Sequence, residues 1–400
     1  MELYELIAPC HFGLEAVMKR EILDLGYEIE RVEDGKVTFL ADAEGIAYAN
    51  LFLRTTERIL LKVGQVHAET YDELFEATKA LPWEKFIPKN GKFWVTKANS
   101  IKSKLFSPSD IQSIMKKAIV ERLKQVYHME WFPEDGAQYP IRVSILKDEV
   151  TIGLDTSGVS LHKRGYRKLT AKAPITETLA AALIMLTPWK GDRILVDPFC
   201  GSGTFPIEAA MMAADIAPGL NRSFLAEQWT HLVPKKCWMD AAEDARYRIR
   251  NDIETDIQGF DIDGDVIKSA RENAKLAGVE KRCHFEVADV ADFAAKPEAI
   301  VLTNPPYGER MNTIEGAAKL ARTLGRQMAE HPCAGLYAIT ADMEFESHYG
   351  KRANKRRKMY NGMIPCQLYM YYEAPKFEHK AKPMPKQGFD GKRTVEFKKK

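Results

Sequence analysis

Three short segments of this 400-residue sequence place glycine and polar residues directly after apolar runs that have the length of a strand. They are Asp197-Pro198-Phe199-Cys200-Gly201-Ser202-Gly203-Thr204, then Gly259-Phe260-Asp261-Ile262-Asp263, and then Asn304-Pro305-Pro306-Tyr307-Gly308. In open α/β sheets, ligands bind beyond the carboxyl ends of the strands. The position of the three segments therefore predicts one binding site at that edge of a sheet.

The first segment has the pattern of a ligand-binding turn. It ends the strand Arg-Ile-Leu-Val and precedes a helix that we expect over 204–214. Glycines let the backbone approach a ligand, and a helix N-terminus offers N–H groups to an anion. A purely structural strand-to-helix corner is the alternative interpretation. Cys200 lies inside the turn, which favours a small packing residue over a nucleophile for cytosine-C5 chemistry.

Two carboxylates follow at the ends of the next two strands. Asp261 could accept hydrogen bonds from both hydroxyls of a ribose, and Asp289 could accept one from an adenine amino group. In a compact nucleotide-binding unit the acid follows the glycines by roughly 20 residues. Here Asp261 comes 58 residues after Gly203, which predicts an insertion over 215–250. Because aspartate is also common at helix N-termini, a capping role remains open for both residues.

The elements that must position these residues follow an alternating pattern in the second half of the chain. Apolar strands alternate with helical periodicity, which is typical of a doubly wound parallel sheet. Two further runs are separated only by Gly362 and predict an antiparallel hairpin, so the sheet should end in a reversed strand. The expected strands are 193–198, 257–262, 283–288, 298–303, 335–341, 355–361 and 363–373, and the expected helices are 204–214, 264–277 and 314–330.

The first half of the chain has a mixed α and β pattern. A helix over 13–26 is followed by strands 27–33 and 36–40, joined by Asp34-Gly35, a strong hairpin signal. Further along we expect strand 92–98, helix 109–126 and the strand pair 140–146 and 149–155. These patterns predict a small α+β unit and a second mixed domain before the parallel sheet.

Taken together, the three segments resemble the class I S-adenosylmethionine-dependent methyltransferases that modify exocyclic amino nitrogens. The whole chain is similar to the bacterial family that joins a THUMP RNA-binding domain to such a catalytic domain, and to the N-terminal part of the large-subunit rRNA guanine-N2 methyltransferase. The stretches that carry this wider resemblance are His162 to Arg167, Ala173-Pro174 with Glu177 to Ala180, and Ser103 to Ala118. The resemblance implies an α/β Rossmann-like methyltransferase domain, preceded by an α+β THUMP-type domain.

The third segment suits methylation of an aromatic-ring amine. Such an amine is a poor nucleophile because its lone pair is delocalised into the ring. If the Asn304 side-chain oxygen and the Pro305 carbonyl accept its two N–H groups, the lone pair can turn toward a methyl donor. Pro305 and Pro306 stiffen the turn, and Tyr307 can stack on an extruded base, which contributes roughly 1–3 kcal/mol. A rigid loop that closes a strand is the alternative interpretation.

The resemblance implies S-adenosylmethionine as the cofactor and assigns the remaining residues of the site. The methionine end is expected at the glycine turn, the ribose at Asp261 and the adenine at Asp289 and Val290. The full set of expected cofactor residues is Asp197, Gly201, Ser202, Gly203, Thr204, Asp261, Ile262, Asp289 and Val290.

Bulk charge predicts no partner, because 58 basic and 56 acidic residues leave a net charge of +2. Local clusters are more informative: 97–124 holds seven Lys and Arg against two acids, 162–172 holds five against none, and a third cluster spans 351–358. Solvated faces are the alternative, but beside a THUMP-like domain these clusters favour contact with RNA phosphates. The expected RNA-binding residues are Lys102, Lys104, Lys116, Lys117, Lys163, Arg164 and Arg167.

The sequence also predicts a soluble cytoplasmic protein without metal. The six cysteines lack CxxC spacing and the nine histidines lack HxxxH or HExxH spacing, which disfavours a zinc site or a disulfide framework. The first residues are acidic, unlike a signal peptide, and no apolar run reaches the ~18–20 residues of a membrane helix.

We therefore expect methyl transfer from S-adenosylmethionine to the N2 amine of a guanine in structured RNA, most simply 23S rRNA. The alternatives are a tRNA guanine-N2 methyltransferase, a DNA adenine-N6 or cytosine-N4 methyltransferase, and an RNA-binding assembly factor with an inactive methyltransferase fold. The expected parts are an N-terminal ferredoxin-like unit over 1–45, a THUMP domain over 46–158, a basic linker over 159–172, the methyltransferase domain over 173–374 and a disordered basic tail over 375–400.

Overall fold

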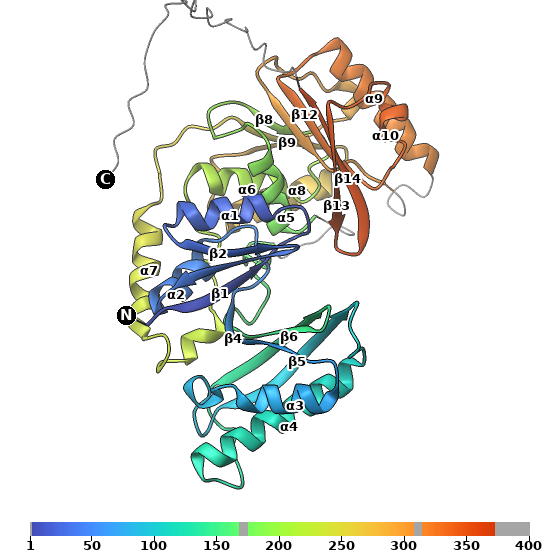
Figure 1. Ribbon diagram of the computed structural model, residues 1–400. Coiled ribbons are helices and arrows are strands. Elements are labelled where there is room, and N and C mark those ends of the chain that lie inside the picture. The colour runs from blue at the N-terminus through green and yellow to red at the C-terminus, as the bar shows by residue number, and fades with distance from the viewer. Residues whose placement is uncertain (1, 168–174, 308–313, 373–400) are drawn as a thin grey trace, which may run out of the picture.

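The computed structural model describes residues 2–167, 175–307 and 314–372, which form two halves that each contain a seven-stranded sheet (Figure 1). Ala173-Pro174, Gly308 and the tail expected over 375–400 lie outside the described residues. No helix among the described residues has the length and apolar character needed to cross a membrane.

The first sheet has the strand order β2-β3-β1-β4-β7-β6-β5. The hairpin predicted at Asp34-Gly35 is confirmed, with Glu33 paired to Lys36 across the turn. Leu61 in β4 pairs with Leu6 of β1 on one side and with Leu154 of β7 on the other. The sheet therefore runs without a break across the boundary expected at residues 45 and 46. Its strands are β1 Tyr4–Pro9, β2 Glu28–Glu33, β3 Lys36–Ala41, β4 Leu60–His67, β5 Lys92–Ile101, β6 Gln138–Leu146 and β7 Glu149–Asp155.

Helices pack on this sheet through one continuous hydrophobic core. The predicted helices over 13–26 and 109–126 are confirmed as α1 and α4. Helix α3 begins with a capping box in which the Thr70 hydroxyl accepts from Glu73 N–H and the Glu73 carboxylate accepts from Thr70 N–H. The helices of this half are α1 Glu15–Asp24, α2 Ala43–Phe52, α3 Tyr71–Ala80, the short 3-10 helix η1 Trp83–Lys85, and α4 Pro108–Tyr127.

The second sheet has the order β10-β9-β8-β11-β12-β14-β13. Its first five strands are parallel, and β14 runs antiparallel to both β12 and β13. The predicted parallel sheet and terminal hairpin are confirmed, but the reversed strand lies next to the edge and β13 forms the edge itself. The strands are β8 Leu195–Asp197, β9 Ile257–Asp261, β10 His284–Val287, β11 Ile300–Thr303, β12 Gly335–Thr340, β13 Lys355–Asn361 and β14 Ile364–Tyr372.

Helices cover both faces of the second sheet, which is why its central strands β11 and β12 are buried along their whole length. Leu195 belongs to the core on one face and Val196 to the core on the other. The first face packs against α5 Glu177–Leu186, α6 Thr204–Ala213 and α8 Gly264–Leu276, and the second against the 3-10 helix η3 Val290–Asp292, α9 Ile314–Glu330 and α10 Phe345–Tyr349.

The insertion predicted over 215–250 is confirmed, and it packs on the first half of the molecule. It contains the 3-10 helix η2 Leu225–Gln228 and the helix α7 Lys235–Tyr247, which lies against α2 (Figure 1). Trp229 is fully buried, stacks on Tyr139 with ring centroids 5.0 Å apart and donates a 2.8 Å hydrogen bond to the Gln138 carbonyl. The insertion thus joins the methyltransferase-like half to the first sheet.

Candidate active site

The glycine turn between β8 and α6 presents one glycine to open space and packs the other against the core. Gly201 and Gly203 have φ angles of +52° and +86°, which favour glycine. A Cβ on Gly203 would lie 2.9 Å from Phe285 Cζ, so this glycine allows the turn to approach β10. A Cβ on Gly201 would meet no described atom within 4 Å. The cradle for a ligand is therefore at Gly201, and Gly203 has a packing role.

Asp197, at the end of β8, ties the turn to the neighbouring strand. Its carboxylate accepts hydrogen bonds from Thr303 Oγ1 at 2.6 Å and from Phe199 N–H at 3.1 Å. Burial raises the pKa of this carboxyl to about 7, although both hydrogen bonds act to lower it. Because the side chain is only 2% exposed, Asp197 positions the turn and offers no surface to a cofactor, contrary to the sequence-based expectation.

Cys200 and Ser202 are also buried within the turn. Burial raises the pKa of the Cys200 thiol well above its ordinary value, so the thiolate that a nucleophile requires is disfavoured. Cys200 therefore packs, as the sequence predicted. Ser202 Oγ has no hydrogen-bond partner within the described part of the chain, which leaves a buried hydroxyl available beside Gly201. The Ser202 carbonyl is held by Asn273 Nδ2 of α8 at 3.1 Å.

Asp261, at the end of β9, contacts the glycine turn directly. Gly201 N–H donates to its Oδ2 and Asp263 N–H to its Oδ1, each at 3.0 Å. The cap of α8 is Asp263, whose side chain accepts from two backbone N–H groups of the first turn. The capping alternative is thus wrong for Asp261, which stays partly exposed beside the 69% exposed Ile262.

Asp289, after β10, does have a capping role. Its Oδ1 accepts from Ala291 N–H at 2.9 Å and caps η3. The residue remains exposed, whereas its neighbour Val290 is buried in the core that packs against α9. Asp289 and Ile262 therefore offer surface at this edge, and Val290 offers little.

The Asn-Pro-Pro-Tyr loop, which follows β11, begins with a buried acceptor that has no partner among the described residues. Asn304 is 8% exposed, and its Oδ1 accepts no hydrogen bond from the described residues. A buried unpaired carbonyl oxygen costs about 1–3 kcal/mol, so such an atom is a good candidate for binding an amine N–H. Asn304 directly follows Thr303, which Asp197 holds. The loop and the glycine turn are therefore fixed to each other.

Tyr307 is held by the terminal hairpin. Its hydroxyl accepts a hydrogen bond from Asn361 Nδ2 at 3.3 Å and lies 3.8 Å from Cys366 Sγ. The ring is partly buried against the core of the second half. Sequence reasoning did not find Asn361 and Cys366, because their role depends on β14 inserting beside β12.

Comparisons with known proteins identify the family of this chain. A family model described as the RMKL-like methyltransferase domain matches residues 164–370, an RlmL ferredoxin-like domain matches 5–60, and a THUMP domain matches 68–155. The "Putative RNA methyltransferase YpsC" of Bacillus subtilis is 44% identical over 375 residues, which cover 93% of this chain and 97% of that protein. The chain belongs to the THUMP-containing, RlmL-like RNA methyltransferases.

Solved structures carry the same fold. A possible methylase from Clostridium difficile is 47% identical, with a TM-score of 0.89 over 93% of this chain and 99% of that one. SMU.472, titled a putative methyltransferase complexed with SAH, is 40% identical, with a TM-score of 0.87 over 94% of this chain and 99% of that one. Like its family, this methyltransferase uses S-adenosylmethionine, and the Gly201 cradle, the Asp261 carboxylate and the buried Asn304 oxygen fit such a cofactor beside an amine substrate.

Relatives with a longer chain also match this methyltransferase. The "Ribosomal RNA large subunit methyltransferase K/L" of Syntrophotalea carbinolica is 34% identical over 372 residues, which cover 89% of this chain. The match covers 52% of that protein, so the methyltransferase spans about half the length of this relative.

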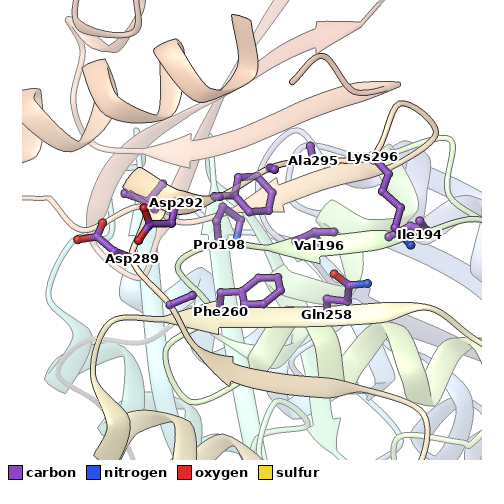
Figure 2. A pocket seen from close by; sticks show the side chains of 13 residues that line it. Ile194, Val196, Pro198, Gln258, Phe260, Asp289, Asp292, Ala295 and Lys296 are labelled. Carbon is purple, nitrogen blue, oxygen red and sulfur yellow. The ribbon is translucent and has the colours of Figure 1, made fainter. Parts of the chain in front are cut away.

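A pocket of about 260 Å³ extends from the site along the face of the sheet that packs against α9 (Figure 2). Asp289 and Asp292 lie at one end, Phe260 lines the middle, and Lys296 and Ile194 lie at the other end (Figure 2). The pocket therefore extends from Asp289, at the carboxyl edge of the sheet, toward Lys296.

Five of the expected RNA-binding residues have side chains at the surface to differing degrees. Lys102, Lys117 and Lys163 are exposed. Lys104 is paired with Glu69, and Lys116 Nζ lies 2.8 Å from Glu134 Oε1 and 3.6 Å from the centre of the Phe93 ring. These three remain available to phosphates, whereas the exposed Lys104 and the half-buried Lys116 would each have to give up a carboxylate partner.

Arg164 is not an RNA-contacting residue, because it is buried and 3% exposed. It donates to the Leu161 carbonyl at 2.8 Å and to the Arg54 carbonyl, and it lies 3.6 Å from Glu208 Oε2 of α6. The expectation that it binds phosphate is therefore wrong, because its guanidinium is buried and already bound to protein groups at the junction between the two halves.

Arg167 also faces inward. Its Nη2 donates to Thr204 Oγ1 at 2.6 Å and to the Ile175 carbonyl at 3.0 Å, and its Nε lies 3.4 Å from Glu177 Oε1. The guanidinium thus braces the first residue of α6. Thr204, expected to contact the cofactor, is buried and uses its hydroxyl to accept from Arg167.

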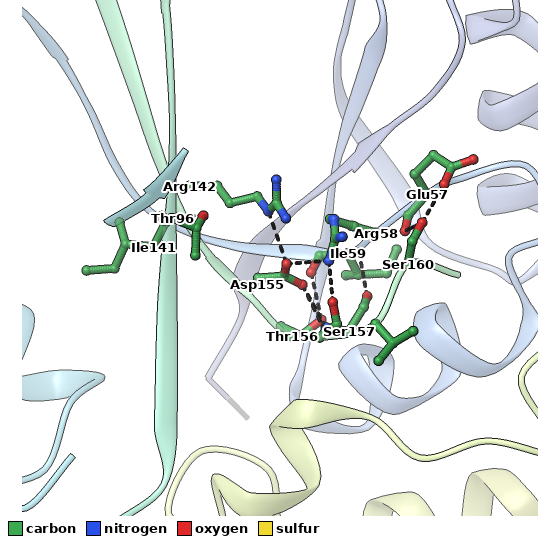
Figure 3. A network of polar contacts seen from close by, with 12 residues as sticks. Glu57, Arg58, Ile59, Thr96, Ile141, Arg142, Asp155, Thr156, Ser157 and Ser160 are labelled. Atoms are coloured by element: carbon green, nitrogen blue, oxygen red, sulfur yellow. Dashed lines mark hydrogen bonds and ion pairs between the residues drawn. The ribbon is translucent and has the colours of Figure 1, made fainter. Parts of the chain in front are cut away.

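A polar network joins the start of β4 to β6 and β7 (Figure 3). Asp155 accepts from Arg58 at 2.6 Å and from Arg142 at 3.0 Å, while Ser157 Oγ accepts from Ile59 N–H at 2.9 Å (Figure 3). Because Asp155 is 2% exposed, the loss of either partner would leave a buried charge less well compensated. The network holds β4, β6 and β7 in one rigid sheet.

Glu57 extends this polar junction to the catalytic half. Burial alone would raise the pKa of its carboxyl, but hydrogen bonds from His162, Ser160 and Thr178 outweigh burial and hold the pKa at about 2. The His162 contact measures 2.7 Å. Since Thr178 lies in α5, an ionised Glu57 connects the first half to the helix that precedes β8.

Proposed function

We propose that this methyltransferase transfers a methyl group to the N2 amine of a guanine in structured RNA, with large-subunit rRNA as the substrate. The observation that carries the proposal is the buried Oδ1 of Asn304, which has no hydrogen-bond partner among the described residues. Three residues later comes Tyr307, whose aromatic side chain is anchored by Asn361. The relatives named as large-subunit rRNA methyltransferases K/L support the choice of rRNA, as does the THUMP domain.

In this proposal the catalytic residues bind and orient the amine. When bound, S-adenosylmethionine supplies a methyl group that its positive sulfur already activates. Asn304 Oδ1 and the Pro305 carbonyl accept the two amine N–H groups, which turns the nitrogen lone pair outward. Pro306 restricts the loop, and Tyr307 stacks on the base. The protein contributes mainly alignment of the reacting atoms, at about 3–3.5 Å.

The cofactor is assigned to the residues that offer surface at the edge of the sheet. The Gly201 backbone would receive the methionine end, with the buried Ser202 hydroxyl directly beside it, and Asp261 would receive the ribose hydroxyls. Ile262 and Asp289 flank the adenine. This surface is held in place by the buried residues Asp197, Gly203 and Thr204, which do not contact the cofactor in this proposal.

Lys102, Lys117 and Lys163 are assigned to RNA phosphates, because each is exposed and phosphate contacts need an accessible cation. Lys104 and Lys116 would join them only after exchanging a carboxylate for a phosphate. A cytoplasmic location follows from an rRNA substrate.

The decisive experiment maps nucleosides by mass spectrometry in total RNA from a strain of the source organism that lacks the gene. We expect one guanine of large-subunit rRNA to lose its N2 methyl group, and plasmid-borne wild type to restore it. Asn304→Ala should not restore it, because removal of one preorganised polar group lowers the rate roughly 100- to 1,000-fold. Asn251→Ala, at an exposed asparagine, is the matched control and should restore the methyl group.

A methyl group lost from the tRNA fraction instead would move the substrate to tRNA. Restoration by Asn304→Ala would refute the catalytic assignment. Failure of the purified protein to bind S-adenosylmethionine in calorimetry would indicate an inactive assembly factor.

A DNA amine is the second candidate, because a structure from Listeria monocytogenes titled a predicted N6-adenine-specific DNA methylase is 45% identical. The Asn-Pro-Pro-Tyr chemistry applies equally to adenine N6 or cytosine N4. The THUMP domain favours RNA. Incorporation of radiolabelled methyl into duplex DNA, but not into RNA from the deletion strain, would decide for DNA.

A further inference from the structure

The tip of the β13–β14 hairpin carries a cluster of exposed apolar side chains. Asn361 pairs with Ile364, which leaves Gly362 and Met363 as the two-residue turn. Met363 is 93% exposed, Tyr360 49% and Ile364 40%. The hairpin projects from the second sheet toward the half that contains the first sheet (Figure 1). Exposure of large apolar side chains to water is unfavourable, and burial in a partner would remove this cost. The tip is therefore suited to insertion into a partner.

This tip adjoins the loop assigned to the target base. Asn361, the last residue of β13, donates to the Tyr307 hydroxyl. Directly paired residues of an antiparallel ladder share a face, so Ile364 lies on the same face as Asn361. Met363 follows Asn361 by two residues, at most roughly 7 Å along the chain. The exposed cluster and Tyr307 therefore belong to one rigid unit.

The strand that leads to the tip is basic. Lys355, Arg356, Arg357 and Lys358 are consecutive in β13. Arg356 lies 3.3 Å from Glu346, and Arg357 donates to the Gly13 carbonyl at 3.2 Å, whereas Lys355 and Lys358 are exposed. Cationic side chains along a strand and an apolar tip at its end match a nucleic acid, which presents phosphates outside and stacked bases inside.

We propose that the hairpin tip enters the RNA beside the target nucleotide and occupies the space that the extruded base leaves. Met363 is the inserting side chain, Ile364 supports it, and the exposed lysines of β13 contact the flanking phosphates. Apolar side chains such as Met and Ile act as wedges between base steps in other nucleic-acid complexes. Because Asn361 ties the hairpin to Tyr307, the wedge and the surface that receives the base approach the RNA together. This inference rests on the proposed RNA methyltransferase function.

The test compares full-length Met363→Ala and Met363→Leu with wild type on two RNA probes. Both probes carry the guanine mapped in the deletion strain, paired with cytosine in one and placed opposite an abasic site in the other. An already unpaired base is easier to extrude. We therefore expect Met363→Ala to lower the ratio of kcat/KM on the paired probe to kcat/KM on the unpaired probe at least about tenfold. Met363→Leu should retain the wild-type ratio.

Met239→Ala, at a methionine of α7 that is 69% exposed, is the matched control and should leave the ratio unchanged. A paired-to-unpaired ratio for Met363→Ala equal to that of wild type would overturn the wedge while leaving the methyltransferase function intact. Wild-type protein that methylates neither probe would overturn the proposed function, and the wedge with it. A 2-aminopurine reporter at the target position should brighten with wild type and less with Met363→Ala.

Discussion

Gly201 and Gly203 lie two residues apart in one turn and have separate physical roles. Both have positive φ, but only Gly203 lies against a wall formed by Phe285 and Ala270. The position at Gly201 is open and is the one that we assign to the ligand, and the closed position at Gly203 determines how tightly the turn packs on β10.

We expect Gly203→Ala to destabilise the protein by about 1–3 kcal/mol, because overpacking adds to backbone strain. Gly201→Ala should show the smaller loss of stability and the larger loss of affinity for S-adenosylmethionine. Thermal unfolding without ligand and calorimetric titration with S-adenosylmethionine measure the two effects. Equal losses of stability in the two variants would contradict the division of roles.

Asp197 makes the stability of the catalytic half depend on pH. Its pKa is raised to about 7 by burial, so the folded state binds a proton more tightly than the unfolded state does. The resulting stabilisation is complete at pH values below about 4, the pKa of an unfolded aspartate, and is lost as pH rises to about 7, by up to about 4 kcal/mol.

Asp197→Asn keeps an oxygen that accepts from Thr303 and removes the titration. The Tm of this variant should therefore fall less than that of wild type between pH 5 and pH 7.5 in matched buffers. Parallel Tm curves for the two proteins would show that another group dominates the pH dependence.

At the level of single residues, motif spacing identified the polar groups of the site but not their exposure. Asn304, Tyr307 and Asp261 lie where the expected strand ends placed them. Arg164 and Arg167 looked like their exposed neighbour Lys163, because a basic run has no apolar periodicity that marks an inward side. Their burial depends on carboxylates of α5 and α6 that only the tertiary fold brings near.

At the level of elements, the insertion between α6 and β9 connects the two halves through their hydrophobic cores. Trp229 fills the core beneath β6, while Leu14 and Val17 of α1 belong to the core of the second sheet. Each half thus contributes apolar side chains to the core of the other.

Trp229→Ala should cost about 3–5 kcal/mol, as expected for a large side chain removed from a core. The exposed Trp131, at 73% exposure, provides the control Trp131→Ala, which should change stability by no more than about 0.5 kcal/mol. Urea denaturation measures both variants, and limited proteolysis should show earlier cleavage between the halves only in Trp229→Ala. Similar denaturation midpoints would mean that the insertion does not hold the halves together.

Helix α1 and the strands of the second sheet were predictable from the sequence, and helix α2 was not. The helix α1 and the strands of the second sheet matched their patterns closely. Helix α2 escaped detection because it is buried against both the sheet and α7, so its sequence Ala-Glu-Gly-Ile-Ala-Tyr-Ala-Asn-Leu-Phe is apolar nearly all round. The insertion itself was predicted from the spacing of the motifs, but the surface on which it packs depends on the tertiary fold.

At the level of the whole molecule, the continuous first sheet means that the ferredoxin-like and THUMP parts form one structural unit. Strand β4 hydrogen-bonds to β1 and to β7. Cutting between the two parts would expose the edge of β4 and remove the helices that cover its core.

A fragment of residues 46–158 should therefore fail to unfold cooperatively, whereas a fragment of residues 2–167 should show a defined thermal transition. Circular dichroism during heating compares the two, and gel filtration reports aggregation through the open edge. A cooperative transition in 46–158 equal to that of the longer fragment would show that the THUMP part folds alone.

The packing of α7 on α2 also has a consequence for folding during synthesis, because α7 is synthesised long after α2. A ribosome releases the strands of the first sheet well before the residues that shield α2 and Tyr139. At roughly 5–20 residues per second, synthesis from β7 to α7 takes on the order of ten seconds, whereas collapse takes microseconds. Every nascent copy therefore spends that interval with an uncovered apolar face, and a pause in translation there would be the point of greatest risk of aggregation.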